Sequence, residues 1–452
     1  MRLTNNFILR FEYFGGLLIS REDKSIFELD NKHTVFLYAL RRTGSLKSTK
    51  EHFNSLRTDE LEEFIHNLLA IGAVDESIYK KERVSWEEVL EISKEIDSKT
   101  QAVADKNYFS FPLQVTLYPS LLCNLNCSFC FLETKKDKNS RNNLSNLFDI
   151  VDQCDEAGVM TISILGGEPT MYPHLIELLQ YIEKKKIHVS FTTNGTRITD
   201  KLVKFLQTTN YVTPVVSIQA FSEFNKEVMG VPFEVIQMGM KKLYEGNITF
   251  NVNTVFLKQD MKELKKIMDF CHNHSVKKFS LGYYLPSNPA NTVKVNYGFA
   301  HARIVREELI EYLEQKNYSM NFMLEGCMFY SAYPEFLEEE ITLTPYEALA
   351  YGCEAGNSKL DIMSDGRISA CPAFSNSLFL EEPNAFEHNL TEVWEKSSVL
   401  NDLRNIKTKD EKCKKCVLVD FCNGGCPAMN LNKYQSYNEF GDDRCVIKEH
   451  IS

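Results

Sequence analysis

Six short apolar runs in the middle of this 452-residue chain limit its possible folds more than any other feature. From about Phe111 onward, the runs end near Tyr118, Leu165, Thr193, Gln219, Phe256 and Tyr284. Each of the first five runs is followed by a segment with helical periodicity. Strands and helices that alternate in this way predict an α/β fold with a parallel sheet, curved or partly closed, which binds ligands at the carboxyl ends of its strands.

The first part of the chain has a different pattern. Three short strand candidates lie between Phe7 and Leu29, and three helices are expected after them. The clearest helix has apolar residues at helical spacing from Leu61 to Leu69, begins after the cap Thr58-Asp59 and stops at Gly72. We interpret the charged segment that follows, to about residue 106, as a linker helix.

Three cysteines stand close together directly after the first strand of the α/β region: Cys123, Cys127 and Cys130. Three thiolates on one loop can converge on one side of a metal cluster. A [4Fe-4S] cluster has four irons, so three protein ligands leave one iron open to bind a substrate or cofactor. A zinc knuckle is the alternative, but it needs a fourth Cys or His nearby, and none lies close in the sequence.

A second group of seven cysteines occupies the last hundred residues. The chain opens with an apolar stretch too short for a secretory signal, so we expect a cytosolic protein whose thiols stay reduced. Reduced thiols favour metal binding over a disulfide framework for these cysteines, with a zinc ribbon as the alternative to an iron–sulfur site. Cys154 and Cys271 fall within helical patterns, and we expect both to be small buried apolar residues.

The C-x3-C-x2-C spacing of the first group, with Phe129 before its last cysteine, resembles the signature of the radical S-adenosylmethionine (SAM) superfamily. The sequence Gly166-Gly167-Glu168-Pro169 after the second strand is similar to the motif with which that family binds the SAM amino group. The resemblance implies a partial (β/α)6 barrel of the TIM type. It also implies that an electron from the cluster cleaves SAM to a 5′-deoxyadenosyl radical, which abstracts a hydrogen from the substrate.

The same resemblance implies further SAM contacts at strand ends. Phe129 belongs to the implied SAM site, as do Ser217, Gln219 and Asn253. Many relatives have Asp at the position of Gln219, so the chain departs from the family there. An ordinary polar residue at a strand end is the alternative for Ser217, Gln219 and Asn253.

The C-terminal spacing resembles the seven-cysteine SPASM extension of radical SAM enzymes, including Gly366 before Cys371. That domain binds two auxiliary [4Fe-4S] clusters, which implies three clusters in this chain. The implied ligands are Cys353, Cys371 and Cys426 for the first auxiliary cluster, and Cys413, Cys416, Cys422 and Cys445 for the second. Some relatives have an eighth cysteine where this chain has Glu347, so either the first auxiliary cluster keeps an open iron or Cys327 is its fourth ligand.

The resemblances together imply a domain order and a function. Residues 1–75 resemble a PqqD-like, winged-helix peptide recognition element, to which a leader peptide adds a strand; a packing or oligomerisation domain is the alternative. A linker helix (76–106), the barrel (107–310), a bridging region (311–352) and the SPASM domain (353–452) follow. We expect a maturase of a ribosomally made peptide, which abstracts a hydrogen and forms a thioether with a cysteine of that peptide.

Other functions remain open at this point. The alternatives are a carbon–carbon or other crosslink, a formylglycine-forming sulfatase maturase, and a non-catalytic iron–sulfur protein. A maturase needs an electron donor such as flavodoxin or ferredoxin. The net charge of −11 argues against nucleic acid as a partner, and no apolar run is long enough to span a membrane.

Overall fold

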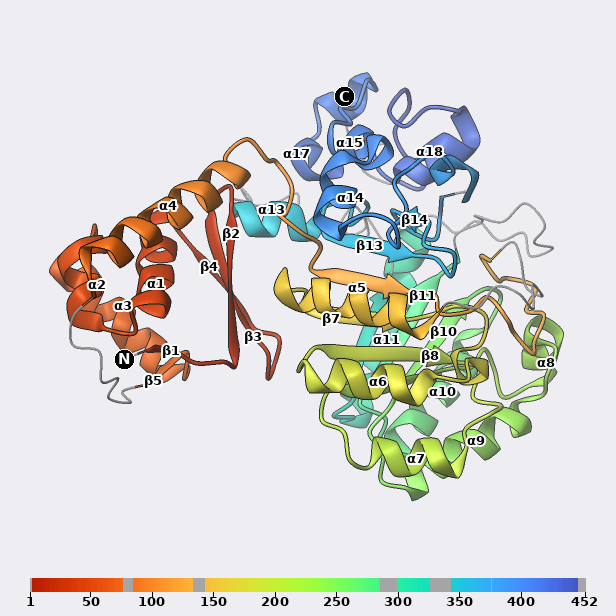
Figure 1. Cartoon of the computed structure of the whole chain (residues 1–452). Helices are drawn as coiled ribbons and strands as arrows, with labels where there is room; N and C mark the ends of the chain where they lie inside the picture. Colours follow the sequence, from red (N-terminus) through yellow and green to blue (C-terminus); the bar gives the residue numbers. More distant parts are fainter. Residues whose placement is uncertain are drawn as a thin grey trace. The chain divides into compact units, whose positions relative to one another are not determined.

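The computed structural model describes residues 2–75, 84–132, 143–284, 299–325, 343–374 and 376–445. The chain forms two compact units, one of residues 1–113 with 155–160 and one of residues 114–154 with 161–452 (Figure 1). None of the helices in the described ranges is long and apolar enough to cross a lipid bilayer.

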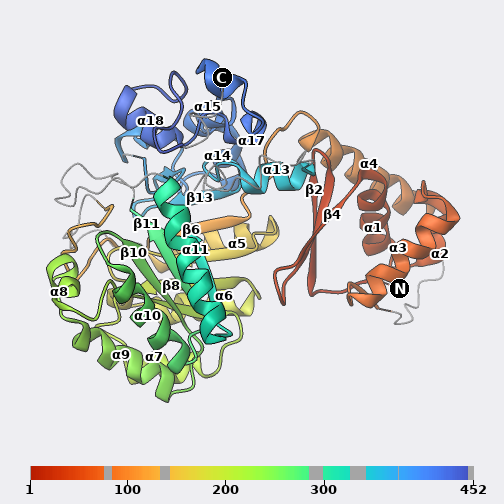
Figure 2. The ribbon, with the colours of Figure 1, turned by 180° about the vertical axis from the view of Figure 1, so that it is seen from behind.

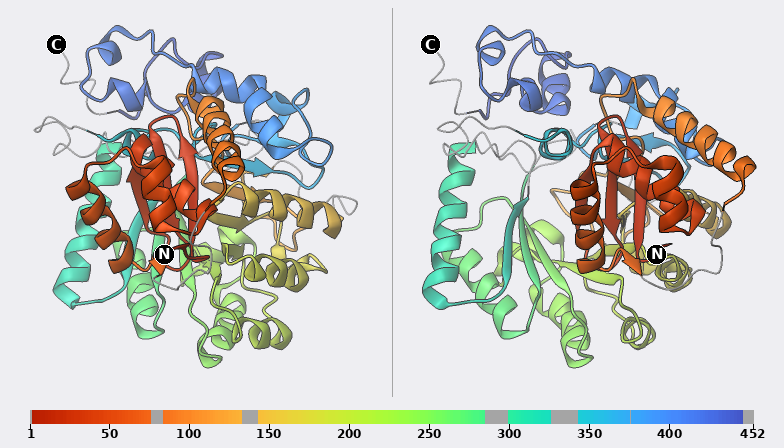
Figure 3. Two further views of the ribbon diagram at one scale, coloured as in Figure 1. Left: turned by 60° about the vertical axis from the view of Figure 1, so that its left-hand side comes forward. Right: turned by 90° about the vertical axis from the view of Figure 1, so that its left-hand side faces the viewer.

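The N-terminal unit contains a small antiparallel sheet with strand order β2-β3-β4, seen beside its helices in Figure 3. Its elements are β1 (Arg2–Leu3), β2 (Phe7–Glu12), β3 (Gly15–Ser20), β4 (Ile26–Leu29), α1 (Asn31–Thr43), α2 (Leu46–Phe53), α3 (Thr58–Ala70), β5 (Val74–Asp75) and α4 (Trp86–Val103). Three strands followed by three helices were predicted, and the structure confirms them. The predicted start of α3 was slightly wrong: the helix begins at Thr58 itself, because the N–H of Arg57 donates to Glu60 and caps it.

Helix α4 packs on the rest of this unit. Its buried residues Ile92 and Ile96 contact Ala39 of α1 in one apolar cluster. A capping box at Ser85 and Glu88 starts the helix. The segment expected to be a linker helix therefore forms a helix whose apolar face is covered by α1.

A buried ion pair joins β2 to the end of this unit. Arg10 Nη2 lies 2.8 Å from Glu12 Oε1, and neither side chain is more than 4% exposed. Arg10 also donates to the carbonyl oxygen of Phe111 at 2.6 Å, and Glu12 accepts from the N–H of Ser110 at 2.7 Å. Burial lowers the pKa of Arg10 and raises the pKa of Glu12. The charge of the partner shifts each pKa in the opposite direction, but by less than burial does. The pair therefore holds Ser110 and Phe111 against β2, and each charge depends on the other.

Replacing Arg10 with Met should lower the free energy of unfolding of the N-terminal unit by about 3 to 5 kcal/mol, because Glu12 then stays buried without its cation. The double variant Arg10→Met/Glu12→Leu should regain most of this loss. Arg42→Met is the matched control, since it breaks a half-exposed pair with Glu95 that is worth about 1 kcal/mol or less. Urea unfolding measures all three, and equal losses for Arg10→Met and Arg42→Met would contradict the prediction.

The larger unit is built on one sheet with strand order β12-β11-β10-β9-β8-β7-β6-β13-β14. Strands β6 to β11 run parallel in chain order and confirm the predicted α/β barrel. These strands and the helices between them are β6 (Gln114–Leu117), α5 (Leu144–Glu156), β7 (Thr161–Ile164), α6 (Leu175–Lys184), β8 (His188–Thr193), α7 (Asp200–Leu206), β9 (Val212–Ser217), α8 (Glu223–Met229), α9 (Phe233–Glu245), β10 (Asn251–Phe256), α10 (Met261–Asn273) and β11 (Lys278–Tyr283). The helices cover the outer face of the curved sheet (Figures 1 and 2).

Two strands extend the barrel sheet at its ends. At one end, β12 (Asn321–Glu325) follows α11 (Phe299–Lys316) and pairs in parallel with β11. At the other end, β13 (Lys359–Ile362) pairs in parallel with β6, the first barrel strand, and β14 (Ile368–Ser369) turns back against β13. The cysteine-rich region is therefore fused to the barrel through a shared sheet.

The rest of the cysteine-rich region consists of short helices. They are α13 (Pro345–Tyr351), α14 (Leu390–Lys396), α15 (Ser398–Arg404), α16 (Glu411–Lys414), α17 (Val419–Cys422) and α18 (Pro427–Tyr434). The core here includes Trp394, which is fully buried with the guanidinium of Arg404 4.3 Å from its ring centroid. Such short elements explain why the sequence has little periodicity in this region.

Candidate functional site

The first group of cysteines lies on the loop that follows β6, at the carboxyl edge of the barrel sheet. Cys123, Cys127 and Cys130 are each half-buried, as is Phe129, and none of the described cysteines forms a disulfide. The thiol of Cys127 lies 3.9 Å from the carbonyl oxygen of Met229, at the end of α8. The loop is thus held beside the barrel with its three thiols close together in the chain.

The two glycines before Glu168 pack against the stem of this cysteine loop. The N–H of Gly167 donates to the carbonyl oxygen of Ser120 at 3.0 Å, and the N–H of Glu168 donates to that of Leu122 at 2.8 Å. A Cβ on Gly166, which has φ +135°, would lie 2.3 Å from the oxygen of Ser120, and one on Gly167 would lie 2.3 Å from the oxygen of Leu122. Both positions therefore need glycine, because the backbone of the cysteine loop's stem lies too close to leave room for a Cβ.

Glu168 has a buried and well-ordered carboxylate. It is 1% exposed, and Oε1 accepts from the hydroxyl groups of Thr170 and Thr193, each at 2.6 Å, and from the N–H of Thr170 at 3.0 Å. Oε2 accepts from the N–H of Asn194 at 2.7 Å. A carboxylate oxygen can accept more than one hydrogen bond, so Oε2 keeps capacity for a further donor such as an ammonium group.

The three polar residues expected at later strand ends have different surroundings. Gln219 is 1% exposed, and its Oε1 accepts from the N–H of Val255 at 2.9 Å, so this side chain ties β9 to β10. Ser217 and Asn253 are paired in register on those two strands and share one face of the sheet. Asn253 Oδ1 is buried and has no hydrogen-bond partner among the described residues, so it can accept from a ligand.

Buried acceptors without hydrogen-bond partners gather on this inner face of the sheet, although one of them, Asp361 Oδ1, lies 3.8 Å from Lys359 Nζ. By strand register, Thr116, Asn251, Asn253 and Asp361 all point to the face opposite the helices, and each has a buried oxygen that lacks a hydrogen-bond partner in the described structure. The hydroxyl of Tyr118 donates to Asp361 Oδ2 at 3.3 Å. Unpaired buried acceptors are rare in proteins, so this face fits a ligand-binding role.

Tyr118 and Asp361 are residues that the sequence reasoning missed. Burial raises the pKa of Tyr118 well above its usual value, and negative charge at Asp361, Cys371 and Cys130 adds to the effect. Tyr118 is therefore close to one predicted ligand of the SAM cluster and to one of the first auxiliary cluster. The sequence signal for Asp361 is an acidic residue between the apolar residues Leu360 and Ile362.

The predicted ligands of the first auxiliary cluster come from three separate turns. Cys353 follows α13, Cys371 follows β14, and Cys426 begins α18. Asp442 accepts from the N–H of Cys426 at 3.1 Å. Gly366, with φ +82°, forms the turn between β13 and β14 that brings the chain back to Cys371.

Glu347 stands where some relatives have an eighth cysteine, and it has a structural role. It forms a capping box with Thr344 at the start of α13: Glu347 Oε2 accepts from the N–H of Thr344 at 2.9 Å, and the N–H of Glu347 donates to Thr344 Oγ1 at 3.2 Å. Cys327, the other candidate for the fourth ligand, lies outside the described residues.

The predicted ligands of the second auxiliary cluster lie in and beside two short helices, with Cys413 in α16, Cys422 in α17, Cys416 between them and Cys445 after α18. Cys413, Cys416, Cys422 and Cys445 are all half-buried. Burial raises the pKa of Cys416, and negative charge at Cys445 raises it further, so these two thiols lie near each other. Cysteine binds metal as the thiolate, so cluster binding must release the protons of these thiols.

The donor set suits iron–sulfur clusters. In the described part of the chain, no three side chains of His, Cys, Asp or Glu are close enough to hold a single metal ion. Every predicted ligand is a cysteine, and thiolates are the ligands that iron–sulfur clusters use. Cys154 and Cys271 are fully buried in α5 and α10, which confirms their prediction as small buried apolar residues.

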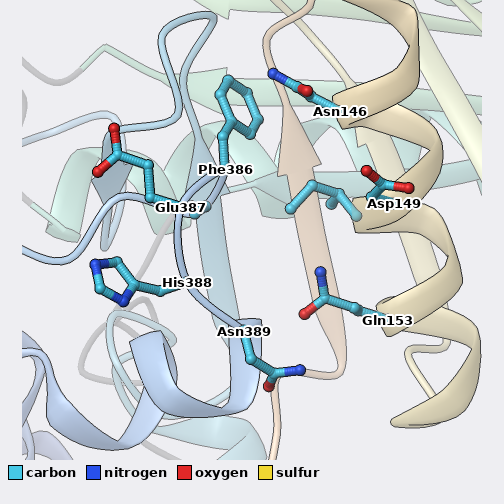
Figure 4. Close-up of a pocket in the computed structure, with 9 residues that line it drawn as sticks. Asn146, Asp149, Gln153, Phe386, Glu387, His388 and Asn389 are labelled. Atoms are coloured by element: carbon cyan, nitrogen blue, oxygen red, sulfur yellow. The ribbon is translucent and has the colours of Figure 1, made fainter.

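A polar pocket of about 470 Å³, open to solvent, lies between α5 and residues 385–389 (Figure 4). None of the predicted site residues lines it. Beside it, Gln153 Oε1 accepts from the N–H of Leu390 at 2.7 Å. This contact caps the start of α14 and fastens the cysteine-rich region to the barrel.

Comparison with known proteins adds two family matches. Residues 117–271 match the radical SAM superfamily, and residues 353–417 match the iron–sulfur cluster-binding domain called SPASM. The first match contains the predicted SAM cluster loop and Glu168. Of the seven C-terminal cysteines, the second match contains Cys353, Cys371, Cys413 and Cys416, whereas Cys422, Cys426 and Cys445 lie beyond it.

The whole chain is similar to SuiB of Streptococcus suis, in a crystal structure with its precursor peptide SuiA. The two are 31% identical, with a TM-score of 0.85, over 98% of this chain and 99% of that one. A crystal structure of SuiB bound to SAM gives a TM-score of 0.83. The mycofactocin maturase MftC of Mycobacterium tuberculosis is 25% identical over 71% of this chain and 79% of its own length. The subtilosin biosynthesis protein AlbA of Bacillus subtilis is 23% identical over 78% of this chain and 75% of its own length.

Proposed function

Since this chain belongs to the radical SAM superfamily and carries its SPASM extension, we propose that it matures a ribosomally made peptide by forming a thioether within it. The protein is a radical SAM peptide-modifying enzyme, and its cofactors are SAM and [4Fe-4S] clusters. Three clusters, with the ligands assigned above, are part of the proposal. Likeness over the full length to a protein crystallised with its precursor peptide supports a peptide substrate most directly.

The chain's own residues would divide the work of binding. Cys123, Cys127 and Cys130 would hold the SAM cluster, which supplies the electron for SAM cleavage. Glu168 Oε2 would accept from the SAM ammonium, since the four hydrogen bonds to this carboxylate already fix it in place. Asn253 Oδ1, buried and without a partner in the described structure, would accept from the same ligand or from substrate.

The thioether is favoured by the ligand count of the first auxiliary cluster. Glu347 is engaged at the start of α13 through both its carboxylate and its N–H, so Cys353, Cys371 and Cys426 are the assigned ligands there. An open iron suits a soft thiolate, and a substrate cysteine held at that position would be close to the carbon radical. If Cys327 closes the cluster instead, a carbon–carbon crosslink becomes the better proposal.

Alkylation of the product distinguishes these reactions. The reconstituted enzyme is incubated anaerobically with SAM, dithionite and the precursor peptide, and the product is treated with iodoacetamide. A thioether uses up one cysteine thiol, so the product should lose two hydrogens and take up one alkyl group fewer than the substrate. A product that loses two hydrogens but keeps all its reactive thiols would indicate a carbon–carbon crosslink. Conversion of a side chain to an aldehyde would indicate formylglycine chemistry.

The leader peptide would bind at β4, an edge strand of the N-terminal sheet. Within the described residues β4 pairs with β3 on one side, whereas β2 at the opposite edge carries the Arg10–Glu12 pair. An edge strand offers alternate N–H and C=O groups to an added strand. Removal of residues 1–75 would expose Ile92 and Ile96 of α4, which could destabilise the remaining chain. Substitution within β4 is therefore the sharper test of peptide binding.

Proline at Phe27 or at Glu28 should separate peptide binding from folding. Successive N–H groups of a strand point in opposite directions, so one of the two variants removes an outward N–H and the other removes a bond to β3. The outward variant should weaken peptide binding about tenfold and leave stability and slow SAM cleavage without peptide intact. Glu28→Ala keeps the backbone and is the control. Peptide affinity that neither proline changes would contradict strand addition at β4.

A further inference from the structure

The loop that carries two predicted ligands of the second auxiliary cluster is strongly basic. Residues 405–417 contain five lysines and two acidic residues, although the chain as a whole has a net charge of −11. Cys413 and Cys416 lie within this stretch, and Lys412, Lys414 and Lys415 beside them are all exposed. Positive charge is therefore concentrated at the surface around Cys413 and Cys416, two predicted ligands of this cluster.

The two acidic residues of the stretch cancel only part of this charge, since five lysines and two carboxylates leave a net charge of +3. Both oxygens of Asp410 accept from backbone N–H groups, Oδ1 from Lys412 and Cys413 at 3.0 and 3.1 Å and Oδ2 from Gly441 at 3.0 Å. Glu411 pairs with Lys414 at 2.7 Å, with side chains 80% and 48% exposed. Such exposed pairs are weak and are easily exchanged for a partner's carboxylate.

Exposed apolar side chains lie in the same region as the lysines. Val417, next to Cys416, is 70% exposed. Phe440 is 51% exposed and precedes Gly441, which is tied to Asp410 of the same loop. An apolar centre with a charged rim is the usual composition of a docking surface, and small surfaces of this kind are typical of brief electron-transfer encounters.

We propose that Lys412, Lys414 and Lys415, with the exposed Val417 beside Cys416, form the docking surface for a small acidic one-electron carrier of the flavodoxin or ferredoxin type. The proposal rests on the proposed function, since SAM cleavage takes up one electron per event. A flavodoxin hydroquinone would lose one electron there and become the semiquinone. The cluster at Cys413, Cys416, Cys422 and Cys445 would gain that electron and pass from its 2+ to its 1+ state.

An acidic stretch of the precursor peptide is the other polyanion that this surface could hold. The carrier is favoured because two predicted cluster ligands lie in the same stretch as the lysines, so an electron that arrives here has a short path into the protein. Charge complementarity mainly accelerates association and makes it dependent on salt. Both effects are measurable without turnover.

The test uses the reconstituted holoenzyme and purified flavodoxin, with binding measured by calorimetry at low and at high salt. The triple variant Lys412→Glu/Lys414→Glu/Lys415→Glu should raise the flavodoxin Kd at low salt by about tenfold or more and remove most of its salt dependence. The control Lys201→Glu/Lys204→Glu/Lys241→Glu changes the net charge equally, at exposed positions on α7 and α9, and should leave the Kd unchanged. Iron content should match the wild type in both.

Electron transfer provides the second measurement. In stopped flow, semiquinone formation from flavodoxin hydroquinone should slow in the first triple variant and stay unchanged in the control. SAM cleavage driven by dithionite should be normal in both variants, because dithionite does not need a docking surface. If the wild-type enzyme makes no crosslink with dithionite, the proposed function is refuted, whereas the proposal for this docking surface is not. If charge reversal lowers iron content, Lys412→Gln/Lys414→Gln/Lys415→Gln replaces it. The proposal is overturned if the first triple variant binds flavodoxin as tightly as the wild type, or if the control variant loses as much affinity. It is also overturned if the first triple variant loses affinity only for the precursor peptide.

Discussion

Alanine at Cys123, Cys127 and Cys130 together should abolish formation of 5′-deoxyadenosine. These three thiols are the only assigned ligands of the SAM cluster, so the variant should lose about four of about twelve irons per reconstituted chain. The auxiliary clusters should remain, because their assigned ligands lie in turns of the cysteine-rich region. Iron analysis, electron paramagnetic resonance and chromatography of the SAM products measure the effect.

Cys271→Ala is the matched control for this experiment. Its thiol is fully buried in α10, where burial raises its pKa, and it belongs to none of the assigned ligand sets. The variant should keep its full iron content and its SAM cleavage and lose about 1 kcal/mol of stability from the smaller side chain. Iron that stays near twelve per chain in the triple alanine variant, or SAM cleavage that survives there, would refute the assignment of the SAM cluster.

Glu168→Gln should weaken SAM binding by at least about tenfold, because the variant loses the negative charge that we propose to bind the SAM ammonium. It should also lower the free energy of unfolding by about 1 to 3 kcal/mol. Three hydrogen bonds converge on Oε1, so the amide oxygen will take that place, and the amide NH2 will then face the N–H of Asn194 as donor against donor.

The control for Glu168 is Glu177→Gln, at an exposed position in α6. Glu177 pairs with His174 at the surface, with side chains 57% and 49% exposed, so its loss should change neither SAM affinity nor stability measurably. Equilibrium dialysis with SAM and thermal unfolding report the two effects separately. SAM affinity equal to wild type in Glu168→Gln would show that this carboxylate serves only to join β7 to β8.

The barrel was predictable because each strand and helix carries its own period in the sequence. Alternating burial in β8 and β10 and the apolar stripe of α6 follow directly from residues near one another in the chain. Strand β13 could not be found in this way. It has four residues, and its pairing with β6 depends on contacts with residues about 240 positions earlier in the chain, which no local pattern reports.

The candidate site could be predicted where one residue type, cysteine, carries the chemistry. It was less predictable where the position of a side chain depends on the packing of strands that are distant in the sequence. The cysteine spacings are the basis of every ligand assignment, which stays a prediction, but they said nothing of Tyr118 or Asp361, whose proximity depends on the pairing of β6 with β13. Gln219 was expected near a strand end, yet its bond to the N–H of Val255 is visible only once β9 and β10 are placed side by side. The capping box at Glu347 was readable from the sequence, because Thr344 stands three residues before it.

The pairing of β13 with β6 has a consequence for synthesis on the ribosome. One edge of β6 has no partner strand until residue 362 has emerged, so most of the chain is made before the sheet is complete. An unpaired edge of this kind can recruit strands from other chains, and long-range pairing of parallel strands is slow. Chaperones that shield nascent chains should therefore matter more for this enzyme than for a barrel in which each strand pairs only with strands that are near it in the sequence.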